Sequence, residues 1–454
     1  VTVSVLYWNT EMSKSIPDWE YEAEYYEALL HLGQAGFKII TDPVKGKGLF
    51  ATKQFLSGET VLRERALCCS QNLDDFKAGV PVCLHCLASL EAPRDVVKRT
   101  AGNAAAAMLP KPPRGYAPPH REPCRNGSKG CAALFCSPRC EADAWDAHHQ
   151  VLCTATKSAE QIRALNSFLG ESWVQDGVDF SDTHFLGLRF FAFATSRHRA
   201  KRMPLKYAYA PIAQLIRAPL EKFHFTYLLA EEYEKDVMKL AGETPAAARS
   251  RRWEHFTKHR SDQNNDPISQ YGRNGGSRTK RAMLEQGVQL MSVMFGWSSD
   301  EVEFFSPERW SELLGAVLLN GQERSPNSEY VVFQELLRQE DKGALSTFHK
   351  KVRAKGIQPQ TFHSSSHGQG IYPVGACFNH SCEPNIQVSY VDDNNETLQV
   401  SALRQIEAGE ELCISYIDED GPVEERQQQL FEHYLFSCGC HKCAKDLASL
   451  RGHA

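Results

Sequence analysis

Two different spacings of hydrophobic residues run along this chain and divide it into regions. Near its two ends, short apolar segments with alternating or turn-bounded patterns predict strands at 37–41, 49–52, 387–391, 397–402 and 412–416. Between them, apolar residues recur with the 3.6-residue period of helices at 160–169, 211–229, 281–295 and 310–319. We therefore expect a β-rich core whose two halves are separated by a long helical insert.

Two further helices are expected outside this insert. Residues 17–32 form an amphipathic pattern with Ser15 as a plausible cap. Residues 424–433 form another, preceded by an acidic stretch that begins at Asp418. Acidic residues suit a helix N-terminus, and they also suit a surface that attracts a basic partner. Both interpretations of the acidic stretch stay open.

Cysteine spacing adds metal sites to this plan. The 15 cysteines fall into short-spaced groups mixed with histidine, which indicates zinc in a reducing compartment. Eight candidate ligands between residues 83 and 153 are enough for two sites. Near the C-terminus, Cys438, Cys440 and Cys443 supply three thiolates, and Cys382 is the natural fourth ligand. Three zinc ions are therefore expected.

The residues around Cys382 carry a family resemblance. Asn379-His380-Ser381-Cys382, the run 410–416 ending in Tyr416, and the cysteine tail together resemble a SET-domain protein lysine methyltransferase. The sequence Gly46-Lys47-Gly48-Leu49-Phe50-Ala51 resembles the start of that family's cofactor site. The cysteine-rich insert narrows the resemblance to the SET-and-MYND subfamily, and the run 414–438 looks most like a plant trithorax-related branch.

The resemblance implies an α+β fold: a SET β-clip core split by a MYND-type zinc module and a large helical insert, and closed by a zinc-binding post-SET tail. The expected divisions are an N-terminal helical segment at 1–35, the first SET part at 36–75 and the zinc module at 76–155. The helical insert would span 156–345, the catalytic core 346–418 and the zinc tail 419–454.

The resemblance also implies site residues and S-adenosyl-L-methionine as cofactor. Tyr416 would be the catalytic tyrosine and Tyr434 the second tyrosine of the lysine channel. Either Tyr416 or bulk water could take the proton from the substrate amine. The implied cofactor-binding residues are Lys45, Gly46, Lys47, Gly48, Asn320, Asn379, His380, Tyr416 and Phe436.

For the zinc module, the resemblance implies cross-braced pairing. Cys83, Cys86, Cys136 and Cys140 would hold one ion, and Cys124, Cys131, His149 and Cys153 the other. His148 is an alternative to His149, and the wide Cys124–Cys131 spacing makes the second site the more doubtful. The proline-rich stretch between Cys86 and Cys124 predicts a flexible loop. MYND modules of this kind suggest a proline-containing peptide partner.

Charge and hydropathy restrict the partners. The net charge of −5 argues against a polyanion-binding chain as a whole and suits a basic protein substrate, such as a histone tail. Basic patches at 197–202 and 249–281 could contact DNA, or be solvated loops. No apolar run approaches membrane-spanning length.

The resemblance implies a histone-lysine N-methyltransferase that acts as a chromatin regulator, and its likeness to the plant branch favours the histone H3 tail as substrate. The expected location is the nucleus, with the cytoplasm as an additional location. The alternatives are methylation of a non-histone protein, or a MYND-mediated transcriptional scaffold with little catalysis.

Overall fold

The computed structural model describes residues 36–42, 46–175, 178–220, 223, 280–390 and 397–452. The expected helix at 17–32, Lys45 and nearly all of the basic stretch 249–281 lie outside these ranges. Within them, no helix combines the length and the apolar character that a membrane span requires.

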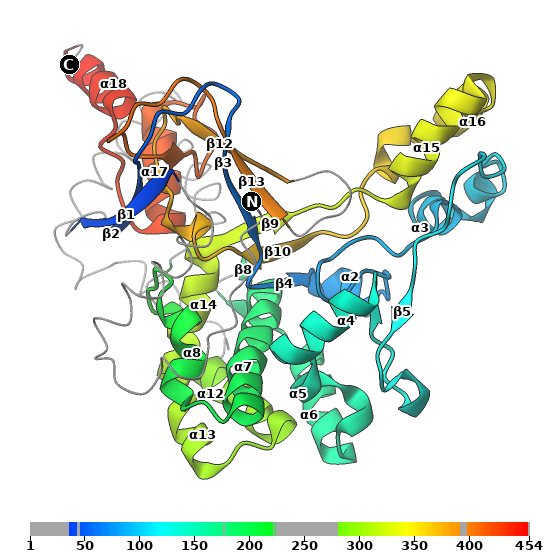
Figure 1. The fold of residues 1–454 in the computed structure, drawn as a ribbon, viewed down its shortest axis with the longest axis horizontal. Coiled ribbons are helices and arrows are strands. Elements are labelled where there is room, and N and C mark those ends of the chain that lie inside the picture. The colour runs from blue at the N-terminus through cyan, green and yellow to red at the C-terminus, as the bar shows by residue number, and fades with distance from the viewer. Residues whose placement is uncertain are drawn as a thin grey trace, which may run out of the picture.

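A set of small sheets forms the β core in the upper part of Figure 1. One sheet has the order β12–β13–β3 (Ile386–Tyr390, Thr397–Ala402, Thr60–Arg65), and another has the order β4–β10–β9 (Cys68–Gln71, Gly368–Ile371, Gly321–Arg324). β1 (Phe37–Asp42) pairs with β2 (Gly46–Ala51), and β11 (Asn379–His380) pairs in parallel with β14 (Cys413–Ile414). Strands from both ends of the chain thus build one core. The expected mixture of helix and strand in a SET-type fold is confirmed.

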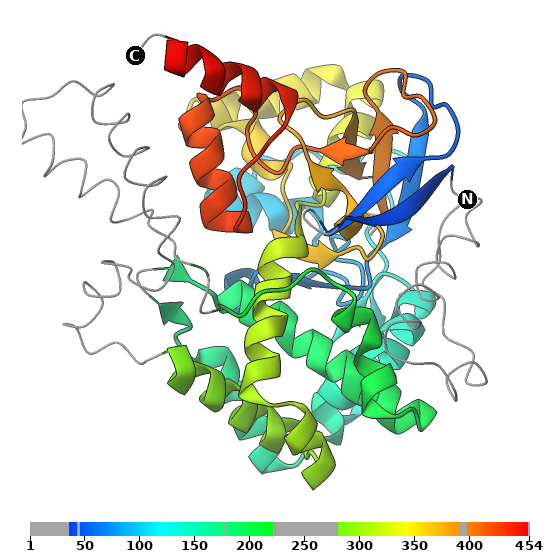
Figure 2. The ribbon, with the colours of Figure 1, turned by 90° about the vertical axis from the view of Figure 1, so that its left-hand side faces the viewer.

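Helices form a separate layer beneath the strands, coloured green in Figure 2. Its main elements are α6 (Ala159–Gly170), α7 (Ser181–Lys201), α8 (Leu205–Ala213), α12 (Lys280–Phe295), α13 (Ser299–Phe304) and α14 (Pro307–Asn320). α7 is buried along most of its length because α8, α14 and β4 pack around it, with Trp310 and Phe191 at the centre of that core, while α12 packs against α6 and α14. A short hairpin, β7 (Val174–Gln175) and β8 (Val178–Asp179), precedes α7.

Most of the expected helices are present, but the one expected at 211–229 is not continuous. α8 begins earlier and ends at Ala213, and residues 214–219 are non-helical. The reason lies in tertiary contacts. Lys47 and Asn320 donate hydrogen bonds to the carbonyls of Gln214 and Ile216, so these carbonyls accept from other segments instead of from a continuing helix.

The zinc module lies beside α7. It contains α2 (Leu73–Lys77) at its edge, the hairpin β5 (Glu122–Pro123) and β6 (Leu134–Phe135), the 3₁₀ turn η2 (Gly127–Lys129) and α4 (Pro138–Ala144). A π-helical turn, η3 (Trp145–His149), then leads into α5 (Gln150–Leu152) and the 3₁₀ turn η4 (Thr154–Thr156). Buried Arg189 of α7 donates to the carbonyls of Cys69 and Leu84, at 2.8 and 2.9 Å, and so joins the module to the helical layer.

The stretch between Cys86 and Cys124 was expected to be a flexible loop, and this expectation is wrong in part. It contains α3 (Pro93–Ala106), which packs with α15 (Glu329–Glu340), α16 (Lys342–Arg353) and the 3₁₀ turn η6 (Pro359–Phe362) around a core of its own. Pro93 occupies the first turn of α3, where a proline needs no backbone donor. The other six prolines of this stretch follow the helix. The prolines of this stretch therefore flank a helix.

The tail consists of α17 (Val423–Tyr434) and α18 (His441–Gly452), seen in red at the upper left of Figure 2. They pack together with the tail cysteines in a small core that includes Leu430 and Val423. The 3₁₀ turn η7 (Gly375–Cys377) leads from the β core to β11, where the Asn379–Cys382 box begins. This box and the tail lie against each other. The expected division boundaries stay predictions, although β9, inside the expected helical insert, joins a core sheet.

Candidate active site and metal centres

Tyr416 stands two residues beyond β14, beside the Asn379–Cys382 box. The parallel pairing of β11 and β14 sets Asn379 opposite Cys413 and His380 opposite Ile414, and so fixes this neighbourhood. The Tyr416 hydroxyl donates to the carbonyl of Phe378 at 2.6 Å. Burial, and then the neighbouring Tyr434, raise the pKa of the Tyr416 hydroxyl. Tyr416 is therefore a protonated hydrogen-bond donor near neutral pH, suited to orienting a group and poorly suited to acting as a base.

Two more aromatic residues from the tail complete this cluster. Tyr434 ends α17, and Leu435 then takes a left-handed conformation with φ of 62°, which turns the chain back toward Phe436. The Tyr434 hydroxyl donates to the Tyr416 carbonyl at 3.3 Å, and their ring centroids are 4.7 Å apart. Phe436 stands edge-on to Tyr416 at 6.3 Å. The structure thus brings together the three aromatic residues that the sequence singled out.

Asn379 is held by a residue that the sequence reading did not select. Its Nδ2 donates to Glu411 Oε1 at 2.8 Å, which leaves the amide oxygen as the acceptor of the side chain. Gly48 lies directly against this pair: a Cβ there would be 2.9 Å from Asn379 Nδ2 and 3.0 Å from Glu411 Oε1. Gly46 has a positive φ of 76°, which glycine adopts without strain. The glycines therefore leave room for the pair and for the backbone turn beside it.

Lys47 and Asn320 lie near each other but face the segment after α8. Lys47 Nζ donates to the Gln214 carbonyl at 2.6 Å, and Asn320 Nδ2 donates to the carbonyls of Ile216 and Ala316, both at 2.7 Å. Asn320 is buried at the end of α14. Both side chains thus hold the segment that follows α8. Their contact with a cofactor stays a prediction, as does that of Lys45 outside the described residues.

Buried Glu64 of β3 supports the turn that precedes the box. Its carboxylate accepts the N–H groups of Val374 and Gly375, at 2.8 and 2.7 Å. Burial raises its pKa to about 7, against the opposing effect of these two hydrogen bonds. Glu64 is therefore partly protonated near neutral pH. Because it lies on β3, it connects the N-terminal part of the core to the turn that precedes Asn379.

The twelve expected metal ligands gather into three groups, and each group is the expected one. They are Cys83, Cys86, Cys136 and Cys140; Cys124, Cys131, His149 and Cys153; and Cys382, Cys438, Cys440 and Cys443. Within each group the ligand atoms all lie within 4.8 Å of one another. Tetrahedral zinc with Zn–S bonds of about 2.3 Å requires sulfurs about 3.8 Å apart. The sulfur pairs at 3.4 to 3.9 Å fit this requirement.

The structure also decides between the two histidines. His149 Nε2 lies 3.4 Å from Cys131 Sγ and 3.3 Å from Cys124 Sγ, while His148 is buried outside the group. The π-helical turn Trp145–His149 sets these residues off the regular helical spacing. A sequence-based prediction that assumed a regular helix could not have shown which of the two histidines is the metal ligand. The wide Cys124–Cys131 spacing accommodates a complete second group.

Side chains around the tail group connect it to the aromatic cluster. His380 Nδ1 accepts the N–H of Tyr416 at 3.0 Å, and its Nε2 lies 3.3 Å from Cys382 Sγ. Arg426, buried on α17, donates to Cys443 Sγ at 3.7 Å and to Asp446 at 2.7 Å. The tail metal group and the Tyr416 segment therefore share hydrogen-bonded neighbours.

A family model described as the SET domain matches residues 46–417. The chain belongs to the SET-domain family. The match begins at Gly46 and ends just after Tyr416, and it includes the zinc module and the helical layer. The β core built from both ends of the chain is therefore the core of the SET domain. The expected enzyme class, a methyltransferase of the SET-and-MYND type, is confirmed.

Relatives of this SET-domain chain extend the similarity. It is 28% identical over 419 residues to mouse "Protein-lysine N-trimethyltransferase SMYD5", covering 88% of this chain and 85% of that protein. It is 27% identical over 329 residues to "Histone-lysine N-methyltransferase ATXR2" of Arabidopsis thaliana, covering 71% and 62%. A SET and MYND domain-containing protein of Dictyostelium discoideum is 42% identical over 81 residues, covering 18% and 15%. The expected plant relative is present, and the animal relative aligns over more of the chain.

The residues around Gly48 fit the S-adenosylmethionine that SET-domain methyltransferases use. Gly48 leaves space beside Asn379, the Asn379 oxygen can accept from an ammonium group, and Phe436 and His380 present rings nearby. Bound there, the cofactor would supply an electrophilic methyl group on its sulfonium. Glu411, which the sequence motif 410–416 contains, acts on this site through Asn379.

Proposed function

We propose that this SET-domain methyltransferase acts on lysine side chains of histones, with the H3 tail as substrate, in the nucleus. The observation that carries the proposal is the hydrogen bond from the Tyr416 hydroxyl to the Phe378 carbonyl, set within a cluster of aromatic rings. A carbonyl and a hydroxyl among half-buried aromatic rings are suited to aligning an amine.

The amine must be neutral when it reacts, although a free lysine has a pKa of about 10.4. Rings of Tyr416, Tyr434 and Phe436 would remove water from the amine, and desolvation disfavours the ammonium form. The raised pKa of Tyr416 keeps its hydroxyl protonated, so water in the channel is the better acceptor for the departing proton. Tyr416 then positions the amine, and alignment can supply roughly 7–11 kcal/mol of the barrier reduction.

The histone substrate is supported by charge and by one relative. Asp418 and Asp420 follow Tyr416 and are exposed, so a basic segment approaching the channel would meet acidic side chains. The plant relative is named a histone-lysine methyltransferase, whereas the mouse relative is named a protein-lysine trimethyltransferase. The second name favours a broader candidate: methylation of a non-histone protein lysine, carried through to the trimethylated product.

The test is methyl transfer from labelled S-adenosylmethionine to free histones, nucleosomes and cell extract, followed by mass spectrometry of the modified peptides. The Tyr416→Phe variant, with cofactor binding checked by calorimetry, is the control for contaminating activity. We expect label on a histone lysine with wild type and roughly 100-fold less with the variant. Label on non-histone proteins alone would overturn the histone substrate and leave the enzyme class intact.

A further inference from the structure

One part of the molecule has a charge opposite to that of the whole. We call it the basic lobe and define it as residues 91–121 and 325–367, which contain α3, α15, α16 and η6. It has twelve Lys and Arg residues against six Asp and Glu, a net charge of +6, whereas the whole chain has −5. The lobe stands away from the other elements at the right of Figure 1. Positive charge is thus concentrated on a projecting part of an acidic protein.

The basic lobe is a folded body. Tyr330, Phe333, Phe348 and Phe362 are almost fully buried in its core, together with Val96 and its neighbours on α3. The lobe therefore holds many of its surface side chains on helices packed around a core, although α3 is kinked at Gly102.

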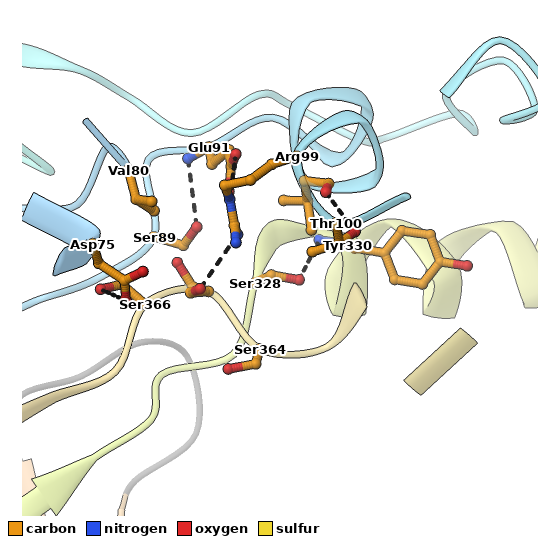
Figure 3. Close-up of polar contacts among 12 residues, drawn as sticks. Asp75, Val80, Ser89, Glu91, Arg99, Thr100, Ser328, Tyr330, Ser364 and Ser366 are labelled. Atoms are coloured by element: carbon orange, nitrogen blue, oxygen red, sulfur yellow. Dashed lines mark hydrogen bonds and ion pairs between the residues drawn. The ribbon is translucent and has the colours of Figure 1, made fainter. Parts of the chain in front are cut away.

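A polar junction fastens the lobe to the zinc module and the β core (Figure 3). Arg99 of α3 forms a bidentate ion pair with Glu91, with Nε–Oε1 and Nη2–Oε2 distances of 3.0 and 2.8 Å. Its Nη2 also donates to the Ser365 carbonyl at 3.3 Å, and Ser366 Oγ donates to Asp75 at 2.8 Å. The Arg99 contacts hold the two segments of the lobe together. The contacts that leave the lobe come from Ser366 and His367: the His367 N–H also donates to Asp75 of α2 at 3.1 Å, and Gln71 Nε2 of β4 donates to Ser366 Oγ at 3.3 Å. These contacts give the lobe a defined position relative to α2 and the β core.

α16 carries four of the lobe's twelve cations and no acidic residue. Its apolar side chains Leu345, Phe348 and Val352 face the lobe core. Its basic side chains are exposed, and they are Lys342, Lys350, Lys351 and Arg353, with Lys355 just beyond the helix. No acidic residue occurs from 342 to 367, and none of these five cations forms an ion pair within the part of the chain that the structure describes.

The helix itself accounts for only part of this pattern. Cations in a last turn stabilise a helix through its dipole, which explains Lys350 and Arg353. It does not explain Lys355 beyond the helix, or the exposed Lys98 and Lys111 of the other lobe segment. The local potential also acts inside the lobe: burial and then the charge of Arg353 lower the pKa of His349.

We propose that the basic lobe binds the phosphate backbone of double-stranded nucleic acid. A protein partner would be expected to bury apolar surface, and neither α3 nor α16 exposes a large hydrophobic side chain. Single-stranded nucleic acid is bound by stacking on aromatic rings, and every Phe and Tyr ring of the lobe is buried or half-buried. What remains exposed is a set of long cationic side chains, which is the chemistry of sequence-independent phosphate contact.

This inference does not depend on which lysine substrate the enzyme uses. It would, however, give a chromatin-directed enzyme a second contact remote from Tyr416, with duplex DNA close to any histone target. The binding assay below contains no methyl-transfer step, so its outcome is separate from that of the substrate screen.

The test is fluorescence anisotropy of the full chain with a labelled random-sequence DNA duplex, from about 50 to about 200 mM salt. The variant combines Lys350→Gln, Lys351→Gln and Arg353→Gln. The matched control combines Lys77→Gln, Lys129→Gln and Arg163→Gln, which removes three exposed cations of the same types outside the lobe. Circular dichroism verifies that both variants are folded.

We expect wild type and control to bind the duplex alike, and the lobe variant to bind at least about tenfold more weakly. Its plot of log affinity against log salt should be shallower by up to about 2.7, because three phosphate contacts are lost. No duplex binding by wild type, or an equal loss in both variants, would overturn the proposal. Tighter binding of an acidic peptide or of single-stranded DNA would assign the lobe to that other partner and also overturn it.

Discussion

His380 joins the tail metal group to the catalytic strand: its Nδ1 accepts the backbone N–H of Tyr416 at 3.0 Å. A ring nitrogen that accepts carries no proton, so the proton is on Nε2, which lies 3.3 Å from Cys382 Sγ. A thiolate bound to zinc would accept from that N–H. The imidazole therefore couples the position of the metal ligand Cys382 to the position of the segment that bears Tyr416.

His380→Phe keeps a ring in this place and removes both hydrogen bonds. At about 1 kcal/mol for each bond, part of which would be felt at Tyr416, kcat should fall roughly five- to tenfold. Metal analysis should still find three zinc ions, since His380 is not one of the grouped ligands. Steady-state kinetics with unchanged kcat would show that the ring alone positions Tyr416.

Cys440→Ser should release the tail. The remaining ligands leave an incomplete site, and bound metal contributes directly to folding, so the zinc content should fall from three ions to two. Because Tyr434 and Phe436 lie on the tail, cofactor binding should weaken and the tail should become protease-sensitive. Cys413→Ser, at a half-buried cysteine outside every metal group, is the control and should retain three ions. Full metal content in the first variant would contradict the ligand assignment.

Glu411→Ala should raise the dissociation constant of S-adenosylmethionine about tenfold. The loss of a hydrogen bond to a charged group costs about 1.5–3 kcal/mol, and here it frees the Asn379 amide to rotate. Glu411→Gln keeps an acceptor for Asn379 Nδ2 and should restore much of the affinity. If calorimetry finds both variants equally weak, the charge of Glu411, and not its orientation of Asn379, governs binding.

The buried Glu64 should make stability depend on pH. Its pKa is raised from 4.5 in the unfolded chain to about 7 in the fold, so the folded state favours the protonated carboxyl. Its contribution is fully present below pH 4.5 and is lost as the pH rises through about 7, by roughly 3 kcal/mol in total.

Urea unfolding at several pH values between 4.5 and 7.5 can measure this contribution. The free energy of unfolding of wild type minus that of Glu64→Gln should fall by roughly 3 kcal/mol across that range. Taking this difference removes the opposite contribution of buried histidines such as His184, whose pKa is lowered by burial. Glu64→Gln should also lower the stability at the acidic end by about 1 kcal/mol, because one acceptor oxygen is lost. Exposed Glu303→Gln should follow the wild-type curve. A difference between wild type and Glu64→Gln that rises with pH over this range would place the Glu64 pKa below its ordinary value.

The sequence was most informative where function depends on short spacings. The twelve metal ligands and the three aromatic residues near Tyr416 come from local motifs, and the structure gathers each of these sets. Glu411 also lies within a quoted motif, but its role depends on a side-chain contact with Asn379 across the β core. Such a contact leaves no mark on hydrophobic periodicity, and so it was missed.

The errors about secondary structure have the same origin. The expected loop before Cys124 contains α3, whose Val96 and Val97 become buried only because α15 and α16 supply the opposite wall. The expected helix at 211–229 is interrupted where distant Lys47 and Asn320 bind backbone carbonyls. Local propensity predicts an element, whereas remote partners decide where it begins and ends.

The hydrogen bond between Glu64 and the N–H of Val374 connects residues 310 positions apart. Contacts of such long sequence separation form late, because a large loop must close before they contribute energy. While the ribosome makes this chain, the early strands β3 and β4 must wait for most of the sequence before their partners β13 and β10 exist. The zinc module and the helical layer, whose contacts are more local, can fold during that interval. The cell must therefore protect an exposed, incomplete β core throughout synthesis, and metal supply to the early cysteines decides how much of the chain is already folded when the last strand arrives.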